Sequence, residues 1–305
     1  MTTTRREFLI GIGAAGTASF LAEARLFGQA RSKIKFGCAA ITWDGNDVQA
    51  IQDVSSLGFP GIQLRSNVVK AYGDRPEALR DLLAKHKLTM AALSSGDVRI
   101  DPAVEREEIE KHAGHAKFVR AVGGVYLQLT DARPKGRPIV ADDYKRLGRM
   151  LTEIGKRAAD VGIPIGYHNH MNNLGERPDE VGWILDAADP KVVRLQLDTA
   201  HYLQGGGDPA RAIREYRDRL IFLHIKDVES PVPGATGDLS RSYRFVELGR
   251  GKVDLKGVFA ALDEIGFKGW AIVELDSVPD KARTPKDANA ISKKYLESLG
   301  FTIGG

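Results

Sequence analysis

The sequence predicts an α/β protein with the (β/α)8 TIM barrel fold in a single domain. Eight apolar runs of strand length alternate with stretches of helical periodicity over about 270 residues, close to the roughly 250 residues of a typical barrel of this kind. A doubly wound open sheet is the alternative, but no glycine-rich dinucleotide loop follows the first run and eight strands exceed what that fold usually needs.

The expected strands follow one another at the spacing of strand–helix units. They are 33–40, 58–65, 87–95, 122–129, 162–170, 192–200, 220–227 and 269–276. The stretches 76–86 and 142–162 show clear helical periodicity. Glycines just before four strands are expected to end the preceding helices, namely Gly58, Gly123, Gly162 and Gly266. The longest irregular stretch, 228–252, follows the seventh strand, and we expect it to form a lid over a functional site.

The overall composition is that of a globular enzyme-sized chain. It has 305 residues, is 43% hydrophobic, and balances 44 basic against 40 acidic side chains for a net charge of +4. Without a basic stripe, no nucleic-acid partner is expected. The single cysteine, Cys38, allows no internal disulfide and is interpreted as a small buried residue.

The first thirty residues differ from the rest and are interpreted as an export signal. Arg5 and Arg6 precede a weakly apolar stretch rich in glycine and alanine, and small residues stand at Gly28 and Ala30 before Arg31. This pattern resembles a twin-arginine signal peptide over 1–30, leaving a domain over 31–305 in the periplasm or otherwise outside the cytoplasm. A basic N-terminus before an amphipathic helix is the alternative. No other run reaches membrane-spanning length, so no membrane span is expected after cleavage.

Four polar side chains stand where predicted strands end. They are His168, Asp198, His224 and Glu274. The C-terminal ends of barrel strands converge on one rim, so residues distant in sequence meet there. Imidazole and carboxylate together suit one divalent metal ion, such as Mn, Co, Mg, Fe or Zn. The sequence therefore predicts a metal-dependent enzyme.

Neighbouring residues offer the remaining chemistry. His170 shares a strand face with His168, so one could bind metal while the other moves protons. His201 suits a substrate contact or an acid–base role, and Lys226 suits an anionic or enolic oxygen. Asp276 is the alternative carboxylate to Glu274.

Other candidates have simpler interpretations. His112 and His115 lie three apart on a charged helix, and we expect both on a solvated outer face. Trp43 follows the first strand and is expected either to wall the pocket or to pack within its loop. Asp227 alternates away from Lys226 and is interpreted as an ion-pair partner or a cap.

The segments "LDTAH", "HIKD", "LGRGKVDL" and "VELD", in this order at strand ends, resemble the sugar isomerase/epimerase superfamily of xylose isomerase-like TIM barrels over roughly 33–300. Members include inosose dehydratase, tagatose 3-epimerase, hydroxypyruvate isomerase and 3-dehydroshikimate dehydratase, and "YHNHM" is similar to a segment of the inosose dehydratases. The resemblance implies metal-binding roles for Asp198, His224 and Glu274. It also implies proton transfer by Glu274, a catalytic role for His170, and substrate binding by His201.

Two positions depart from the superfamily pattern. His168 stands where a glutamate usually binds the metal, which leaves Glu176 as an alternative fourth ligand. Gln63 stands where a glutamate commonly helps to bind substrate, and we expect it to contact substrate here. Lys226 and Arg250 are expected to hold substrate oxygens.

The expected activity is isomerisation or epimerisation of a keto-sugar or related polyol carbonyl compound, by proton abstraction through an enediolate. A metal-dependent dehydratase or lyase of the inosose dehydratase or 3-keto-glycoside type is the alternative. From a different class, a catalytically inactive exported sugar-binding protein is also considered, whereas metal-dependent phosphodiester cleavage would need more ligands and a basic face. The expected partner is a small sugar or sugar-derived molecule, and a homo-oligomer is compatible with these features.

Overall fold

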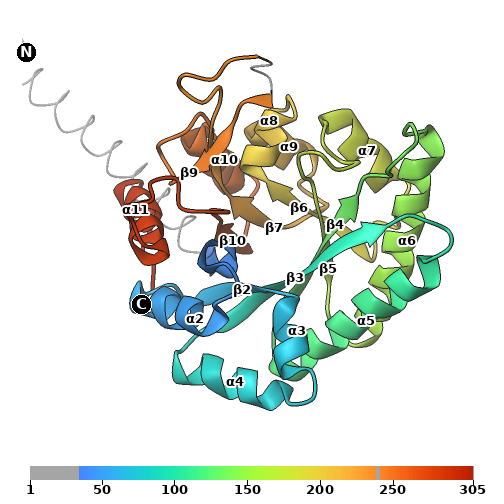
Figure 1. Cartoon of the computed structure of the whole chain (residues 1–305), viewed down its shortest axis with the longest axis horizontal. Helices are drawn as coiled ribbons and strands as arrows, with labels where there is room; N and C mark the ends of the chain where they lie inside the picture. Colours follow the sequence, from blue (N-terminus) through green and yellow to red (C-terminus); the bar gives the residue numbers. More distant parts are fainter. Residues whose placement is uncertain (1–33, 238–240, 305) are drawn as a thin grey trace, which may run out of the picture.

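All eight predicted strands are present and close into a parallel barrel in the computed structural model, which describes residues 34–237 and 241–304 (Figure 1). The barrel strands are β1 (Lys35–Ala39), β2 (Gly61–Arg65), β3 (Thr89–Arg99), β4 (Tyr126–Ala132), β5 (Ile165–His168), β6 (Val193–Asp198), β7 (Leu220–Ile225) and β10 (Trp270–Val273). Neighbouring strands pair in chain order, and β1 pairs with β10 to close the ring. The predicted (β/α)8 fold is therefore confirmed.

Helices surround this barrel and connect its strands (Figure 1). They are the short 3-10 helix η1 (Ala40–Trp43), α2 (Asp47–Ser56), α3 (Asn67–Tyr72), α4 (Pro76–Lys85), α5 (Glu105–Val122), α6 (Ala141–Asp160), α7 (Pro178–Asp186), α8 (Thr199–Gln204), α9 (Pro209–Glu215), α10 (Leu255–Glu264) and α11 (Pro285–Ser298). The four glycines expected to end helices all adopt positive φ, between 64° and 83°. This conformation favours glycine, so these stop signals are confirmed.

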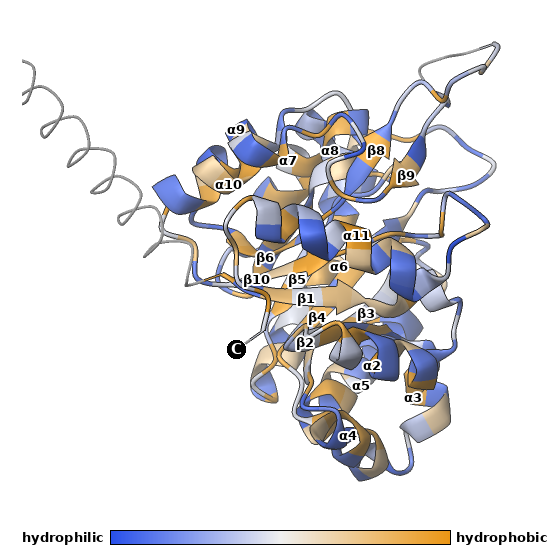
Figure 2. Cartoon of the chain, turned by 90° about the vertical axis from the view of Figure 1, so that its left-hand side faces the viewer, coloured by the Kyte–Doolittle hydropathy of each residue, from blue (hydrophilic) through white to orange (hydrophobic). Residues whose placement is uncertain are grey.

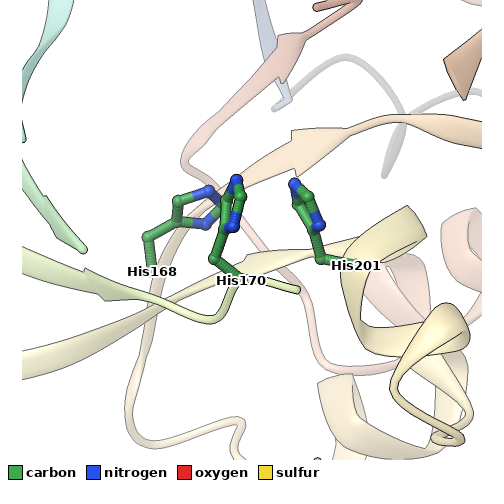
Figure 3. Close-up of side chains that lie close together, drawn as sticks. All are labelled: His168, His170 and His201. Atoms are coloured by element: carbon green, nitrogen blue, oxygen red, sulfur yellow. The ribbon is translucent and has the colours of Figure 1, made fainter. Parts of the chain in front are cut away.

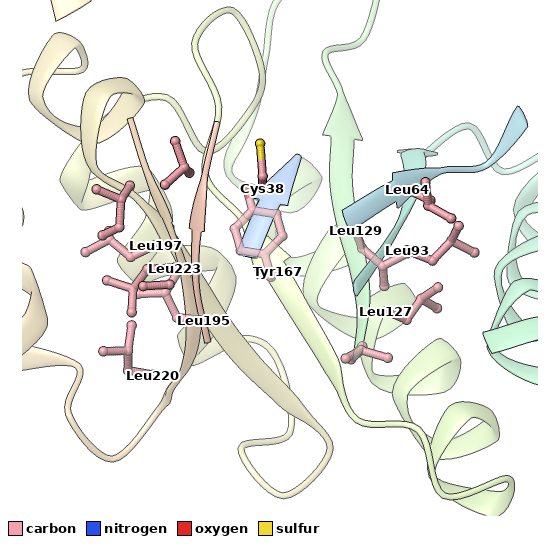
Figure 4. Packing of buried hydrophobic residues seen from close by; sticks show 14 of the residues in the cluster. Cys38, Leu64, Leu93, Leu127, Leu129, Tyr167, Leu195, Leu197, Leu220 and Leu223 are labelled. Carbon is pink, nitrogen blue, oxygen red and sulfur yellow. The ribbon is translucent and has the colours of Figure 1, made fainter. Parts of the chain in front are cut away.

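Apolar side chains fill both sides of the barrel wall. Leucines of β2, β3, β4, β6 and β7 pack outward against the helices, with Tyr167 and Cys38 between two groups of them (Figure 4). Cys38 is fully buried and its thiol donates to Asn289 Oδ1 at 3.2 Å, which confirms its interpretation. The helices turn hydrophilic faces outward (Figure 2).

The interior of the barrel is apolar at its N-terminal end and polar toward its C-terminal end. A cluster that includes Trp270 and Ile272 fills the N-terminal end, where Tyr126 stacks on Phe222 with ring centroids 4.8 Å apart. A side chain at Gly61 would collide with the Trp270 ring, so glycine is needed there. Because side chains alternate along strands, the next inward layers carry the polar groups described below.

The long stretch after β7 folds back over the C-terminal rim. Within it, β8 (Asp227–Glu229) pairs with β9 (Arg244–Val246) as an antiparallel ribbon near α8 (Figure 2). Phe245 of β9 packs on the His201 ring with centroids 4.9 Å apart, as expected of a lid. Asp227 caps the connection, accepting from the backbone N–H groups of Gly249, Gly251 and Val253 at 2.9–3.0 Å.

The predicted signal peptide over 1–30 lies outside the described residues. Among the helices of residues 34–237 and 241–304, none combines the length and apolar character needed to cross a membrane.

Candidate metal and active site

Four strand ends bring the four predicted metal ligands together. His168 ends β5, Asp198 ends β6, His224 lies near the end of β7 and Glu274 follows β10. Each offers one ligand atom, and these atoms all lie within 4.8 Å of one another. All four side chains are buried. The spacing inferred from the sequence therefore produces a compact set of two imidazoles and two carboxylates.

Three buried polar atoms of the cluster have no hydrogen-bond partner within the described part of the protein. His168 Nδ1, Asp198 Oδ2 and His224 Nδ1 are buried without a hydrogen-bond partner. His224 Nδ1 lies 3.4 Å from Asp198 Oδ2 and 3.2 Å from Glu274 Oε1. An unsatisfied buried polar atom destabilises a fold by about 1–3 kcal/mol, so three around one point fit a site that would hold a cation. The donor set fits a divalent transition metal.

Asp198 serves two purposes with its two oxygens. Oδ1 accepts from the backbone N–H groups of Ala200 and His201 at 2.9 and 2.8 Å, which caps α8. Oδ2 remains directed at the cluster. Asp198 is therefore the N-cap of α8 and still presents one oxygen to the cluster.

The electrostatics of the cluster favour a positive charge at its centre. Burial raises the pKa of the Glu274 carboxyl, but His224 and Lys226 outweigh it and hold that pKa well below its ordinary value. Burial lowers the pKa of His224, but Glu274 and Asp198 outweigh it and raise that pKa to about 9. Burial, reinforced by His224, keeps the pKa of His168 well below its ordinary value, so its imidazole is neutral. The carboxylates of Glu274 and Asp198 therefore favour positive charge at the centre of the cluster.

Three glutamines beneath the cluster orient His224. Its Nε2 lies 2.9 Å from Gln63 Oε1 and donates to it. The amide of Gln63 donates to Gln128 Oε1 at 2.6 Å, and Gln196 donates to the same oxygen at 3.1 Å. With the Nε2 proton held by Gln63, His224 presents Nδ1 to the cluster. The sequence analysis did not predict this relay. The segments IQL, LQL and LQL in β2, β4 and β6 each place a glutamine between apolar strand residues and could have indicated it.

A polar cavity of about 240 Å³ opens above the cluster. Its lining includes Ala39, Ile41, Gln63, Arg65, Ser94, Gly96, Asp97, Gln128, Thr130, His168, His170, Asn173, Glu274 and Asp276. The predicted residues Gln63, His170 and Glu274 therefore reach the space that a substrate would occupy. A bulge in β3 also brings Asp97 there, where it accepts from Thr130 Oγ1 at 2.6 Å, and sequence reasoning missed this residue.

His170 is poised to accept a proton. Its Nδ1 lies 2.7 Å from the Met171 carbonyl oxygen and must donate to it. This hydrogen bond fixes the tautomer, so Nε2 carries the free lone pair. His170 is half-buried and lines the cavity.

His201 and Lys226 lie behind the cavity and outside its lining. Fully buried Lys226 places its Nζ 3.0 Å from Glu274 Oε1, 2.6 Å from Asp276 Oδ1 and 3.2 Å from His201 Nε2. His201 Nδ1 faces the Met171 N–H at 3.2 Å. The structure therefore assigns Lys226 to holding two carboxylates, in place of the predicted contact with a substrate oxygen.

Three histidines lie together at this mouth (Figure 3). The rings of His170 and His201 have centroids 3.8 Å apart, and those of His168 and His170 lie 5.6 Å apart. Together they could offer a second set of ligand atoms within 4.8 Å. The Lys226 ammonium beside His201 Nε2 opposes a cation there, so the set with two carboxylates is the better metal centre.

Three residues expected at the site lie elsewhere. Glu176 accepts from Arg241 Nη1 at 2.7 Å and from the Asn172 N–H at 2.8 Å, so it is not an alternative to His168. Trp43 is buried in its loop, where Nε1 donates to Asp53 Oδ2 at 2.8 Å. Arg250 Nη1 lies 3.6 Å from Glu247 Oε2, and Arg250 is not among the residues that line the cavity. Each of the three side chains has a closer partner outside the cavity.

The prediction that His112 and His115 are solvated is wrong. Both face β3, where Ser95 Oγ lies 2.5 Å from His112 Nδ1 and 2.8 Å from His115 Nδ1. His112 is fully buried, and its Nε2 lies 3.5 Å from Glu108 Oε2. Residues three or four apart share a helix face, and this face of α5 packs against the barrel.

Comparison with known proteins agrees with this arrangement. The family model for the xylose isomerase-like TIM barrel matches residues 51–298. An inosose dehydratase from Lacticaseibacillus casei is 28% identical over 87% of this chain and 97% of its own length. The rhizopine catabolism protein MocC from Rhizobium meliloti is 27% identical over 82% of this chain and 83% of its own length.

Solved structures show the same fold. The IolI protein with a bound zinc atom superposes with a TM-score of 0.72 at 21% identity, covering 87% of this chain and 98% of that one. A D-tagatose 3-epimerase-like protein gives 0.70 at 18% identity, covering 88% and 98%. The family match spans most of the barrel, and the chain therefore belongs to the xylose isomerase-like TIM barrel family.

Proposed function

We propose that this protein is a metal-dependent isomerase or epimerase that abstracts a proton next to the carbonyl of a keto-sugar or related polyol. The observation that carries the proposal is the buried cluster of His168, Asp198, His224 and Glu274, which opens on a polar cavity beside a free imidazole nitrogen of His170. The enzyme relatives named above support an enzyme of this family.

The residues divide the work between binding and proton transfer. The four clustered side chains would hold one divalent metal ion, which when bound supplies Lewis-acid polarisation of the substrate carbonyl. His170 Nε2 or the Glu274 carboxylate takes the proton from the neighbouring carbon, leaving an enediolate. Return of that proton to another carbon gives isomerisation, and return to the opposite face gives epimerisation.

Dehydration is the second candidate, and the inosose dehydratase relatives specifically favour it. It begins with the same proton abstraction. His170 or Glu274 would then protonate a departing β-hydroxyl group, and a carbon–carbon double bond conjugated with the carbonyl would form. The two outcomes share one site and differ in whether a group leaves.

A panel of keto-sugars, inososes and 3-keto-glycosides, offered in D2O to protein reconstituted with each metal, would test the proposal. Isomerase or epimerase activity would appear by NMR as a new sugar with deuterium next to the carbonyl, whereas a dehydratase would produce an absorbing enone. His170→Ala should abolish either signal, and His86→Ala serves as a matched control at the end of α4. Metal-loaded protein that yields neither a deuterated sugar nor an enone from any of these compounds would overturn the proposal and favour a binding protein.

We further propose that residues 1–30 direct export by the twin-arginine route, on the basis of Arg5, Arg6 and the small residues before Arg31. None of the barrel strands lies in this segment, so a chain starting at Arg31 should fold and bind metal. Replacing both arginines with lysine should retain the full-length protein in the cytoplasm, as fractionation and mass spectrometry would show. Normal export of that double variant would refute the twin-arginine route.

A further inference from the structure

A groove adjoins the cavity above the metal cluster. Its volume is about 950 Å³, and loops after β3, β4 and β5 form most of its lining. Asp97 and Asn173 line both spaces, so the two meet along these side chains. The cavity itself, at about 240 Å³, is smaller than the roughly 300–1,000 Å³ of typical small-molecule sites. A substrate larger than one small ring would therefore extend into the groove.

The groove presents mostly positive side chains. Five cationic residues line it, namely Arg99, Lys111, Arg133, Lys135 and Arg137. The lining contains two acidic residues, Asp97 and Asp101. Asp101 is engaged with its own backbone, because Oδ1 accepts from the Ala103 N–H at 2.9 Å.

The carboxylates that balance these cations lie beneath the surface. Glu108 is fully buried and lies 2.7 Å from Arg99 Nη2 and 2.8 Å from Lys111 Nζ, whereas the side chains of Arg99 and Lys111 are 50% and 37% exposed. Asp143 is 7% exposed and bonds Arg137, which is 47% exposed. Buried carboxylates thus anchor three exposed cations and leave further N–H groups facing the groove.

Two more cations of the groove, Arg133 and Lys135, have a distant carboxylate partner or, in the described part of the chain, none. Arg133 is 41% exposed and lies 3.9 Å from Glu176, a carboxylate already bonded to Arg241 at 2.7 Å. Lys135 is exposed and no carboxylate lies within 4 Å of it among the described residues. Donors held in place before binding suit an anion, because little ordering of side chains remains to be done.

We propose that the groove recognises an anionic group, such as a carboxylate, on a sugar unit attached to the one that reacts. Arg99 stands two residues beyond Asp97 on β3, roughly 7 Å along the strand, so the cations begin within reach of a second sugar unit. Asp97 and Asn173 at the junction offer hydrogen bonds to hydroxyl groups of the linked sugar. The inference rests on the proposed function in one respect, namely that the reacting sugar unit occupies the cavity.

The test is calorimetric titration of the full chain with two disaccharides that differ in one group: cellobiouronic acid, which carries a carboxylate, and cellobiose. At low ionic strength the acid should bind about tenfold more tightly, the effect of one charge-assisted hydrogen bond. The difference should shrink in high salt. The double variant Arg133→Ala, Lys135→Ala should remove most of it.

The matched control is Lys145→Ala, Arg149→Ala on α6, which removes the same charge outside the groove and should keep the preference. Equal affinity for the two disaccharides, no binding of either, or equal loss in both double variants would overturn the inference. A retained preference for the acid without deuterium exchange in any keto-sugar would overturn the proposed carbonyl chemistry alone.

Discussion

Two groups of histidines, one at the barrel mouth and one between the barrel wall and α5, differ in the groups that surround them. At the barrel mouth, His168 and His224 share their space with two carboxylates, carry unpaired nitrogens and adjoin a cavity. Between β3 and α5, His112 and His115 converge instead on one hydroxyl, that of Ser95, with no lining role in either cavity described above. Burial and histidine content are common to both. The first group differs in having two carboxylates beside its imidazoles and in adjoining a cavity that a ligand could enter.

The sharpest test of this contrast is removal of one histidine from each group. His224→Ala should lower metal affinity by more than the roughly 10–100-fold that loss of a supporting residue causes, because a ligand itself is lost. His112→Ala should retain the metal of the unmodified protein. Elemental analysis after dialysis against a weak chelator would measure both. Full occupancy in His224→Ala would remove that residue from the ligand set.

Replacing His170 should reduce turnover without loss of metal, in contrast to replacing a residue of the metal cluster. His170→Ala should keep the metal but lower kcat by ~10²–10⁴-fold, the usual loss for a general acid–base group. His115→Ala is the matched control from the other group and should stay near full activity. Loss of metal from His170→Ala would show that His170 is a ligand and that its division of labour with His168 is reversed.

The glutamine relay predicts a smaller effect on the same metal. Gln63→Leu deprives His224 Nε2 of its acceptor, so metal affinity should fall by about 10–100-fold. Gln63→Glu keeps an acceptor oxygen and should restore much of that affinity. Gln196→Leu, which removes only a contact to Gln128, should have a lesser effect. Identical affinities in all three variants would contradict a positioning role for Gln63.

The buried His112 of the second group should affect how the free energy of unfolding depends on pH. Burial, reinforced by Lys111, lowers the pKa of His112 from 6.5 to about 3. A depressed pKa in the folded protein means that the unfolded chain binds the proton first, so stability is complete above about pH 6.5 and declines as pH falls toward 3.

His112→Gln removes this titration while keeping an amide near Ser95. The slope of unfolding free energy against pH should fall by up to about 1.4 kcal/mol per pH unit across that window. Urea denaturation at a series of pH values would measure it, with the half-buried His86→Gln at the end of α4 as control. Parallel curves for wild type and His112→Gln would show that His112 does not bind a proton on unfolding.

Much of the barrel, and the four side chains of the candidate metal cluster, could be predicted from the sequence by itself. Apolar alternation with a glycine stop before several strands determined eight strands, and strand ends such as His168 and Asp198 followed from them. A parallel barrel must gather such ends on one rim, so the proximity of these side chains followed from the strand assignment. Gln63 and Cys38 were also placed correctly, at the cavity and in the core.

Tertiary structure alone decided the direction and protonation of individual groups. Glu176 and Arg250 lie on loops and Trp43 ends the short helix η1, and the partner that each side chain meets in space cannot be read from sequence distance. The helical face of His112 depended on which side of α5 the barrel covers. Which nitrogen of His224 faces the cluster depended on Gln63, 161 residues away, because Gln63 binds the other nitrogen and that hydrogen bond exists only once the barrel is closed.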